Sequence, residues 1–121
     1  MIKPQELRIG NYVFDIDGDV LQIGQILDIG VKFKNTSLSS RYEKIQPIPL
    51  TEEILLKFGF FKKLGNYELE NFRFHISQPM NFDGFVFCEG YSVITDKIQF
   101  VHQLQNLFFA LTGEELTFKK D

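Results

Sequence analysis

One stretch of this chain carries no charged side chain, although its pattern is that of a surface helix. Residues 96–116 read DKIQFVHQLQNLFFALTGEEL, and no Asp, Glu, Lys or Arg occurs between Gln99 and Thr112. Apolar residues recur there at the three- and four-residue spacing of an amphipathic helix. The pattern predicts one helix over Asp96–Leu116, capped by Asp96 at its start and ended by a left-handed Gly113.

The helix face opposite the apolar stripe is the unusual part. A solvated face normally carries Lys and Glu, often paired four residues apart, but this face carries His102, Gln105, Asn106 and Phe109. One interpretation is that strands or loops of the same domain cover it and satisfy the amides. The other is an interface with a second copy or a protein partner, because interfaces are poor in charge and rich in aromatic residues. These four residues are the candidate partner-binding site.

The bulk properties limit the class of protein. At 121 residues the chain predicts a single compact domain, 1–121. No apolar run approaches the roughly 18 residues of a membrane-spanning helix, so no membrane association is expected. A single cysteine, Cys88, cannot form an internal disulfide and indicates a reducing compartment, the cytoplasm. Because the net charge is −3, the chain has no overall positive potential that would attract the phosphate backbone of a nucleic acid.

The first part, residues 1–46, is predicted to be built of short strands. Alternating apolar residues indicate strands over 7–14, 20–27, 31–34 and 41–46, with a tight Asp-Gly turn after the first and a bulge at Gly24 in the second. This spacing is typical of a small Src-homology-3-like β-barrel or a curled meander.

The second part, residues 47–121, is predicted as a helix, an antiparallel meander and the long helix. Thr51 is expected to cap a short helix, Glu52–Phe58, that ends at Gly59. Strands are expected over 60–63, 67–70, 72–77, 85–89 and 91–95, with a three-residue loop in the first hairpin. The long helix would lie across this meander. The fold class is therefore α+β.

The sequence contains no recognised catalytic or metal-binding pattern. The run Asp15–Asp19 lacks the spacing of a calcium loop and predicts a hairpin turn. His75 and His102 lie on different predicted elements, and Cys88 lies on an apolar strand, as expected for a buried inert thiol. We therefore expect no enzyme activity, no metal and no cofactor.

A weak basic and aromatic strip in the first part offers an alternative site. It consists of Lys32, Phe33, Lys34, Arg41, Tyr42 and Lys44. Cations interleaved with aromatic rings can bind phosphates and stack on bases. Lysines on an edge strand can equally serve to prevent aggregation. Nucleic-acid binding is thus possible but not favoured.

Three segments resemble a known family. LRIGNYV (7–13), IQPIPLTEEILLKFGF (45–60) and VHQLQNLFFALTGEEL (101–116) are similar to a family of small uncharacterised proteins of Bacteroides-type bacteria and their phages or prophages. The resemblance covers both ends and the middle of the chain. No activity is established for that family, so it brings no functional residues. It implies a cytoplasmic protein often carried by mobile elements, which favours a binding role over an enzyme.

Taken together, the sequence predicts a non-enzymatic interaction module. It would bind itself or a protein partner through the uncharged face of the long helix, and a weak nucleic-acid-binding protein is the alternative. A small-molecule cleft between the two parts stays open, because a sequence does not exclude one.

Overall fold

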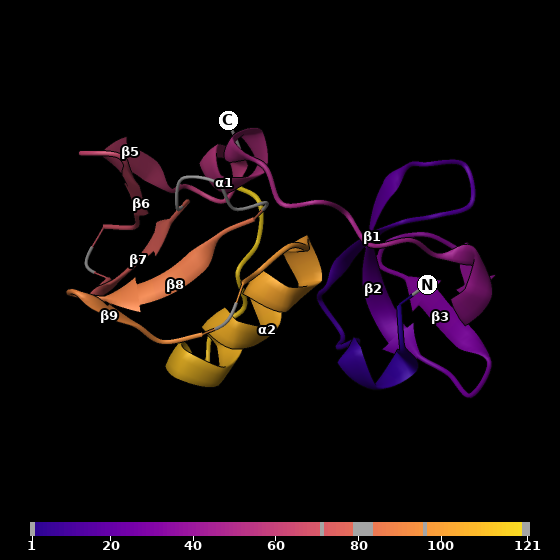
Figure 1. Ribbon diagram of the computed structural model, residues 1–121. Coiled ribbons are helices and arrows are strands. Elements are labelled where there is room, and N and C mark those ends of the chain that lie inside the picture. Colours follow the sequence, from indigo (N-terminus) through magenta and orange to yellow (C-terminus); the bar gives the residue numbers. More distant parts are fainter. Residues whose placement is uncertain (1, 71, 79–83, 96, 120–121) are drawn as a thin grey trace. The chain divides into compact units, whose positions relative to one another are not determined.

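The computed structural model describes residues 2–70, 72–78, 84–95 and 97–119 (Figure 1). It is an α+β protein with a curled four-stranded sheet, a second antiparallel sheet and a C-terminal helix, which confirms the predicted fold class. The chain divides into two compact units. Unit 1 comprises Met1–Pro49 and Phe100–Leu116, and unit 2 comprises Leu50–Gln99 and Thr117–Asp121.

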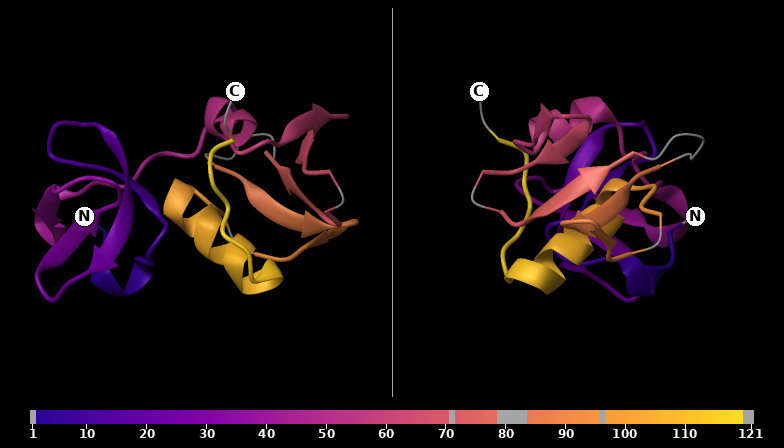
Figure 2. Two further views of the ribbon diagram at one scale, coloured as in Figure 1. Left: turned by 180° about the vertical axis from the view of Figure 1, so that it is seen from behind. Right: turned by 60° about the vertical axis from the view of Figure 1, so that its left-hand side comes forward.

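Unit 1 contains the four-stranded antiparallel sheet, in the order β1-β2-β3-β4. Its strands are β1 (Tyr12–Phe14), β2 (Val20–Ile26), β3 (Gly30–Phe33) and β4 (Ser39–Arg41). The first two are joined by the predicted Asp-Gly turn. The register between β2 and β3 shifts between Ile23 and Gln25, which confirms the predicted bulge at Gly24. Figure 2 shows from two further sides how these strands, coloured indigo to purple, curl.

The predicted fourth strand was misplaced. Instead of a strand over 41–46, the chain forms β4 and then the short 3-10 helix η2 (Tyr42–Lys44). The tyrosine side chain explains the turn, because the Tyr42 hydroxyl donates to the carbonyl of Leu27 and its backbone N–H donates to Ile29. Another short 3-10 helix, η1 (Pro4–Glu6), lies near the N-terminus, before β1.

The core of unit 1 is formed by the inward-facing residues of these strands and of the segments beside them. It consists of Ile2, Leu7, Val13, Ile23, Val31, Phe33, Tyr42 and Ile45, with Leu21 packed against it. The alternation of inward and outward residues along β3 places Val31 and Phe33 inside and leaves Lys32 exposed.

The long helix, α2 (Val101–Thr112), is shorter than predicted and begins later. Phe100 is extended and pairs with Pro49, so the helix starts only after it. Asp96, the predicted cap, lies outside the described residues. The predicted end is confirmed, because Gly113 is left-handed at φ +74°. Residues 100–116 group with Met1–Pro49 in unit 1, whereas the sequence placed the helix in the second part.

Unit 2 contains the helix α1 (Glu52–Lys57) and the second sheet. Thr51 caps α1 as predicted, its hydroxyl accepting from the N–H of Ile54 at 3.3 Å. The sheet is an antiparallel meander in the order β5-β6-β7-β8-β9, as expected. Its strands are β5 (Phe61–Lys63), β6 (Asn66–Glu68), β7 (Phe74–Ser77), β8 (Val86–Glu89) and β9 (Ser92–Val93).

The first hairpin of this meander has a tighter turn than predicted. Lys63 pairs directly with Asn66, which leaves a two-residue loop, Leu64–Gly65, in place of the expected three residues. The sequence also predicts a loop over Gln78–Gly84, from Pro79 and the pair Asp83-Gly84, and most of this loop lies outside the described residues. Among the described helices, none has both the length and the apolar character needed to cross a bilayer.

Candidate functional site

The amide of Gln105 is buried and joins three segments of unit 1. Its oxygen accepts from the backbone N–H of Tyr12 at 2.9 Å. Its nitrogen donates to the carbonyls of Gly10 and Leu116, both at 2.9 Å. Since the side chain has no solvent exposure, these bonds satisfy an amide that would otherwise be costly to bury. Gln105 therefore fastens α2 to β1 and to the residues after the helix.

The next residue of α2, Asn106, organises a second set of bonds. Its oxygen accepts from the Arg8 guanidinium at 2.8 Å and from the Asn11 amide at 2.9 Å. Its nitrogen donates to the carbonyl of Glu6 at 2.6 Å. Arg8 also forms a salt bridge with Glu115 at 2.6 Å, in which both side chains are just over a quarter exposed. The guanidinium is thus held on two sides.

Phe109 is the accessible member of the predicted site. Its side chain is 42% exposed, and Ala110 and Leu111 beside it are also exposed. The guanidinium carbon of Arg8 lies 4.2 Å from the centre of the Phe109 ring, which is a cation–π contact. An arginine with a fixed position therefore covers part of an exposed aromatic ring.

His102 is only 2% exposed and stacks on Phe100, with the ring centres 6.0 Å apart. Its Nε2 lies 3.9 Å from a carboxylate oxygen of Glu6, which is too far for a hydrogen bond. Neither ring nitrogen has a hydrogen-bond partner among the described residues. Burial lowers the pKa of His102, and the negative charge of Glu6 opposes that shift. Burial therefore favours the neutral form of this imidazole.

These positions bear on the two interpretations of the uncharged face. His102 and Gln105 are buried and Asn106 is partly buried, as the first interpretation expects, whereas Phe109 keeps an accessible surface. Sequence reasoning did not select Arg8 and Glu115 for this site. The available signal was an isolated arginine in the otherwise uncharged segment LRIGNYV, about 100 positions before its partners.

The structure separates the residues of the basic and aromatic strip. Lys32, Lys34, Arg41 and Lys44 are exposed on unit 1. Phe33 and Tyr42 are core residues and are at most 9% exposed, so they present no ring on which a base could stack. The alternation of the strand turns Phe33 inward, and the hydroxyl bond to Leu27 holds Tyr42 there.

Asp15, Asp17 and Asp19 bring their carboxylates within 4.8 Å of one another. The residues form the predicted turn between β1 and β2. One oxygen of Asp15 accepts from the backbone N–H groups of Asp17 and Asp19, both at 2.9 Å. These bonds give Asp15 a structural role in the hairpin.

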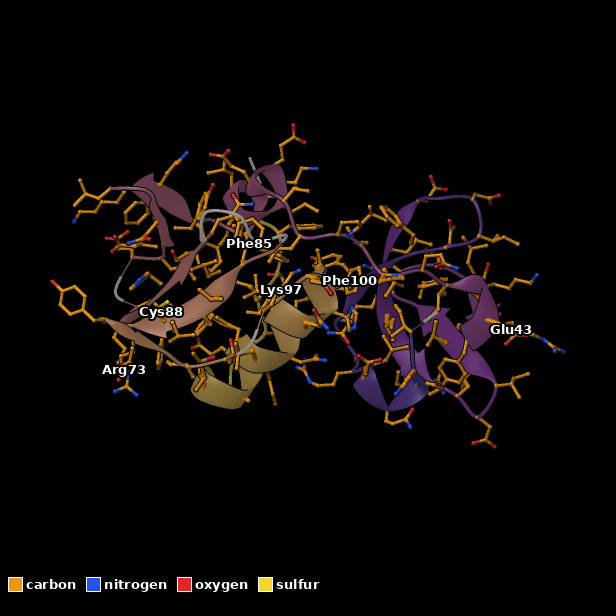
Figure 3. The ribbon with its side chains drawn as sticks, in the orientation of Figure 1. Glu43, Arg73, Phe85, Cys88, Lys97 and Phe100 are labelled. Atoms are coloured by element: carbon orange, nitrogen blue, oxygen red, sulfur yellow. The ribbon has the colours of Figure 1, made fainter. Side chains whose placement is uncertain are left out.

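Strand register brings a histidine and the cysteine of unit 2 together, which the sequence did not reveal. His75 on β7 lies opposite Cys88 on β8 and opposite Glu68 on β6. Figure 3 labels Cys88 and, near it, Arg73, which pairs with Glu89 at 2.9 Å. Burial raises the pKa of the Cys88 thiol, whereas a nucleophilic cysteine requires a lowered pKa. The buried position agrees with the buried, inert thiol that the sequence predicts.

Comparison of the chain with protein-family models, with curated proteins and with solved structures gave no match.

Proposed function

We propose that this chain is a non-enzymatic interaction module that binds a protein partner or a second copy of itself. The contact is made by the accessible end of the uncharged helix face, with Phe109 at its centre and Arg8 beside it. The observation that carries the proposal is the aromatic ring of Phe109, 42% exposed on a helix without charged side chains and packed against a fixed guanidinium.

The chemistry of this pair suits an interface. Aromatic residues and arginine are enriched among the residues that carry most of the binding energy of protein–protein contacts. Ala110 and Leu111 extend the uncharged surface beside the ring. Removing an apolar surface of this kind from water is favourable in free energy and would contribute to binding.

The other predicted site residues support the pair from inside the unit. Asn106 and Glu115 fix the guanidinium of Arg8, and Gln105 fixes the helix that carries Phe109. A side chain that is already ordered loses less conformational entropy when a partner binds. We therefore assign Gln105 and Asn106 a positioning role and Phe109 the contact.

The test is the variant Phe109→Lys, compared with Tyr91→Lys as a matched control. Tyr91 is an exposed aromatic residue of unit 2, so the control makes the same kind of substitution away from the site. Solution mass over a range of concentrations measures self-association, and recovery from host lysate measures partner capture. We expect Phe109→Lys to abolish association with an unchanged thermal midpoint, and Tyr91→Lys to retain it.

Two results would contradict the proposal. If Phe109→Lys unfolds the chain, the residue belongs to the core. If both lysine variants lose association equally, the contact is not specific to the helix face.

The setting is a further part of the proposal. We infer that the protein acts in the cytoplasm of a Bacteroides-type bacterium and accompanies a phage or prophage, on the resemblance of the three segments and the single cysteine. Capture from lysate with and without phage infection tests whether the partner depends on the mobile element.

The alternative function, weak nucleic-acid binding, has the four exposed cations of unit 1 in its favour. These are Lys32, Lys34, Arg41 and Lys44. Binding through cations alone would be electrostatic and would weaken steeply as salt rises. Titration with single strands and duplexes at two salt concentrations tests it, and the absence of salt-sensitive binding would eliminate this function.

A further inference from the structure

Strand β4 forms one edge of the sheet of unit 1, and two of its residues turn their backbone groups away from β3. Of these groups, the carbonyl of Arg41 accepts a long bond of 3.4 Å from the Ser40 hydroxyl. At one end of the β3–β4 ladder the backbone N–H of Tyr42 donates to the carbonyl of Ile29. At the other end the backbone N–H of Phe33 donates to the carbonyl of Leu38. In an antiparallel pair the hydrogen-bonded positions alternate, which makes Ser40 the bonded residue between them. The N–H and C=O groups of Ser39 and Arg41 therefore point away from β3, toward the open edge.

An open depression with a mixed apolar and polar lining lies beside this edge. It measures about 250 Å³ and is lined by Leu27, Ile29, Gly30, Val31 and the three residues of β4. This volume is below the roughly 300 Å³ at which pockets for drug-sized ligands begin, but it suits a protein side chain. Ile29 is 66% exposed at its margin. The depression and the open strand edge are thus parts of one surface.

The sequence segment that contains this surface has a net charge opposite in sign to that of the whole chain. Between Leu27 and Lys44 there are four basic residues, Lys32, Lys34, Arg41 and Lys44, against two acidic ones, Asp28 and Glu43, whereas the whole chain has a net charge of −3. Arg41 lines the depression, and its side chain is 68% exposed. Its contact with Glu43, which Figure 3 shows on the outer side of η2, is 3.9 Å long and weak.

We propose that the β4 edge binds an extended, acidic segment of a partner protein by strand addition. The backbone of the segment bonds to Ser39 and Arg41, one apolar side chain enters the depression beside Ile29, and a carboxylate pairs with Arg41. In this mode of recognition the main chain provides affinity, and pockets for alternate side chains provide specificity. The surface is separate from Phe109, so the inference goes beyond the proposed function.

The probe is an acetylated and amidated decapeptide of alternating valine and glutamate, added to the full-length, isotopically labelled chain. Amide chemical shifts report which residues it contacts. We expect shifts at Ser39–Arg41 and at Leu27 and Ile29, and much weaker binding of the same peptide with lysine in place of glutamate. A valine–glutamate peptide with proline at alternate positions should not bind, because it cannot pair as a strand.

Three variants separate the components of the site. Ser39→Pro removes an outward N–H at an edge position where proline is tolerated, and we expect about tenfold weaker binding for the lost hydrogen bond. Arg41→Glu should abolish the preference for glutamate, whereas Lys63→Glu makes the same charge change on unit 2 and should not. Ile29→Asp should weaken binding more than Leu64→Asp, an exposed apolar residue of unit 2. If Ser39→Pro unfolds the chain, as loss of the dispersed amide spectrum would show, Arg41→Glu and Ile29→Asp test the binding site instead.

Several outcomes would overturn the inference. These are no shift at millimolar peptide, equal binding of the lysine peptide, or shifts confined to residues outside the edge. A single-stranded oligonucleotide that shifts the same amides and displaces the peptide would assign the surface to nucleic acid instead. Phe109→Lys should leave peptide binding unchanged, so that failure here and failure of the proposed helix contact are distinguishable.

Discussion

Gln105 illustrates how a single buried side chain can organise a unit. Its amide makes three hydrogen bonds to backbone groups that belong to two distant parts of the chain. The backbone N–H of Tyr12 and the carbonyl of Leu116 both bond to it, and the carbonyl of Gly10 accepts from Gln22 as well. Removing the amide leaves buried polar groups unpaired, which costs more than the bonds themselves contribute.

We predict that Gln105→Ala lowers the free energy of unfolding by about 3 kcal/mol, because it leaves buried backbone groups without partners. Urea denaturation measures the loss. Gln25→Ala removes the same amide from an exposed position on β2 and should change the stability little. Equal losses in the two variants would show that the Gln105 bonds contribute nothing specific.

His102 makes stability dependent on pH. Its pKa is lowered in the folded chain, chiefly by burial, from an ordinary value of 6.5. Below pH 6.5 the unfolded chain therefore binds a proton that the folded chain does not. By linkage the contribution to stability is complete above this pH and is lost as the pH falls through it.

We predict that the free energy of unfolding declines between about pH 7.5 and pH 5.5. His102→Leu should flatten this decline. Glu6→Gln should steepen it, because the carboxylate opposes the lowering of the pKa. Urea denaturation at the two pH values measures the free energy of unfolding of the unsubstituted chain and of both variants. An unchanged slope in His102→Leu would assign the pH dependence to other groups.

At the scale of the element, the β5–β6 hairpin combines a favourable turn shape with an unfavourable residue. Both residues of its two-residue loop are left-handed, with φ of +52° at Leu64 and +86° at Gly65. A type I′ hairpin loop requires this conformation at both residues, and asparagine followed by glycine is its preferred pair. Leu64 is 95% exposed, so no packing offsets the strain.

We predict that Leu64→Asn raises the free energy of unfolding by about 0.5–1 kcal/mol, since asparagine enters the left-handed region at lower cost. Thermal or urea denaturation measures the gain. Leu56→Asn replaces a half-exposed leucine within α1, where the backbone is helical, and should not stabilise. A gain of the same size in both variants would trace the effect to surface polarity and not to the turn.

At the scale of the whole molecule, the order of residues along the chain differs from their grouping in space. Unit 1 takes residues from both ends of the chain, and unit 2 takes the middle and the last few residues. The uncharged helix therefore belongs with strands that precede it by 60 to 87 residues, counted from Arg41 and Phe14 to Val101. Its amides bond to the segment that contains Arg8 and Tyr12.

Local sequence determined the elements whose signals act within a few residues. The Thr51 cap, the left-handed Gly113, the bulge at Gly24 and the five-stranded meander all follow from such signals and were predicted. The absence of charge on α2 fits the buried part of that face, at His102 and Gln105, whereas Phe109 and Ala110 are exposed. These properties depend on backbone preferences and on the spacing of apolar residues, which a sequence displays directly.

Only the tertiary structure decided what covers that face and where the exposed sites lie. The start of α2 depends on the pairing of Phe100 with Pro49, and the inward position of Tyr42 depends on a bond to Leu27. The guanidinium that lies over the Phe109 ring belongs to Arg8, about 100 residues away in the sequence. An amide can be satisfied by any donor or acceptor that the fold brings near, so its chemistry predicts that it has a partner but not which one.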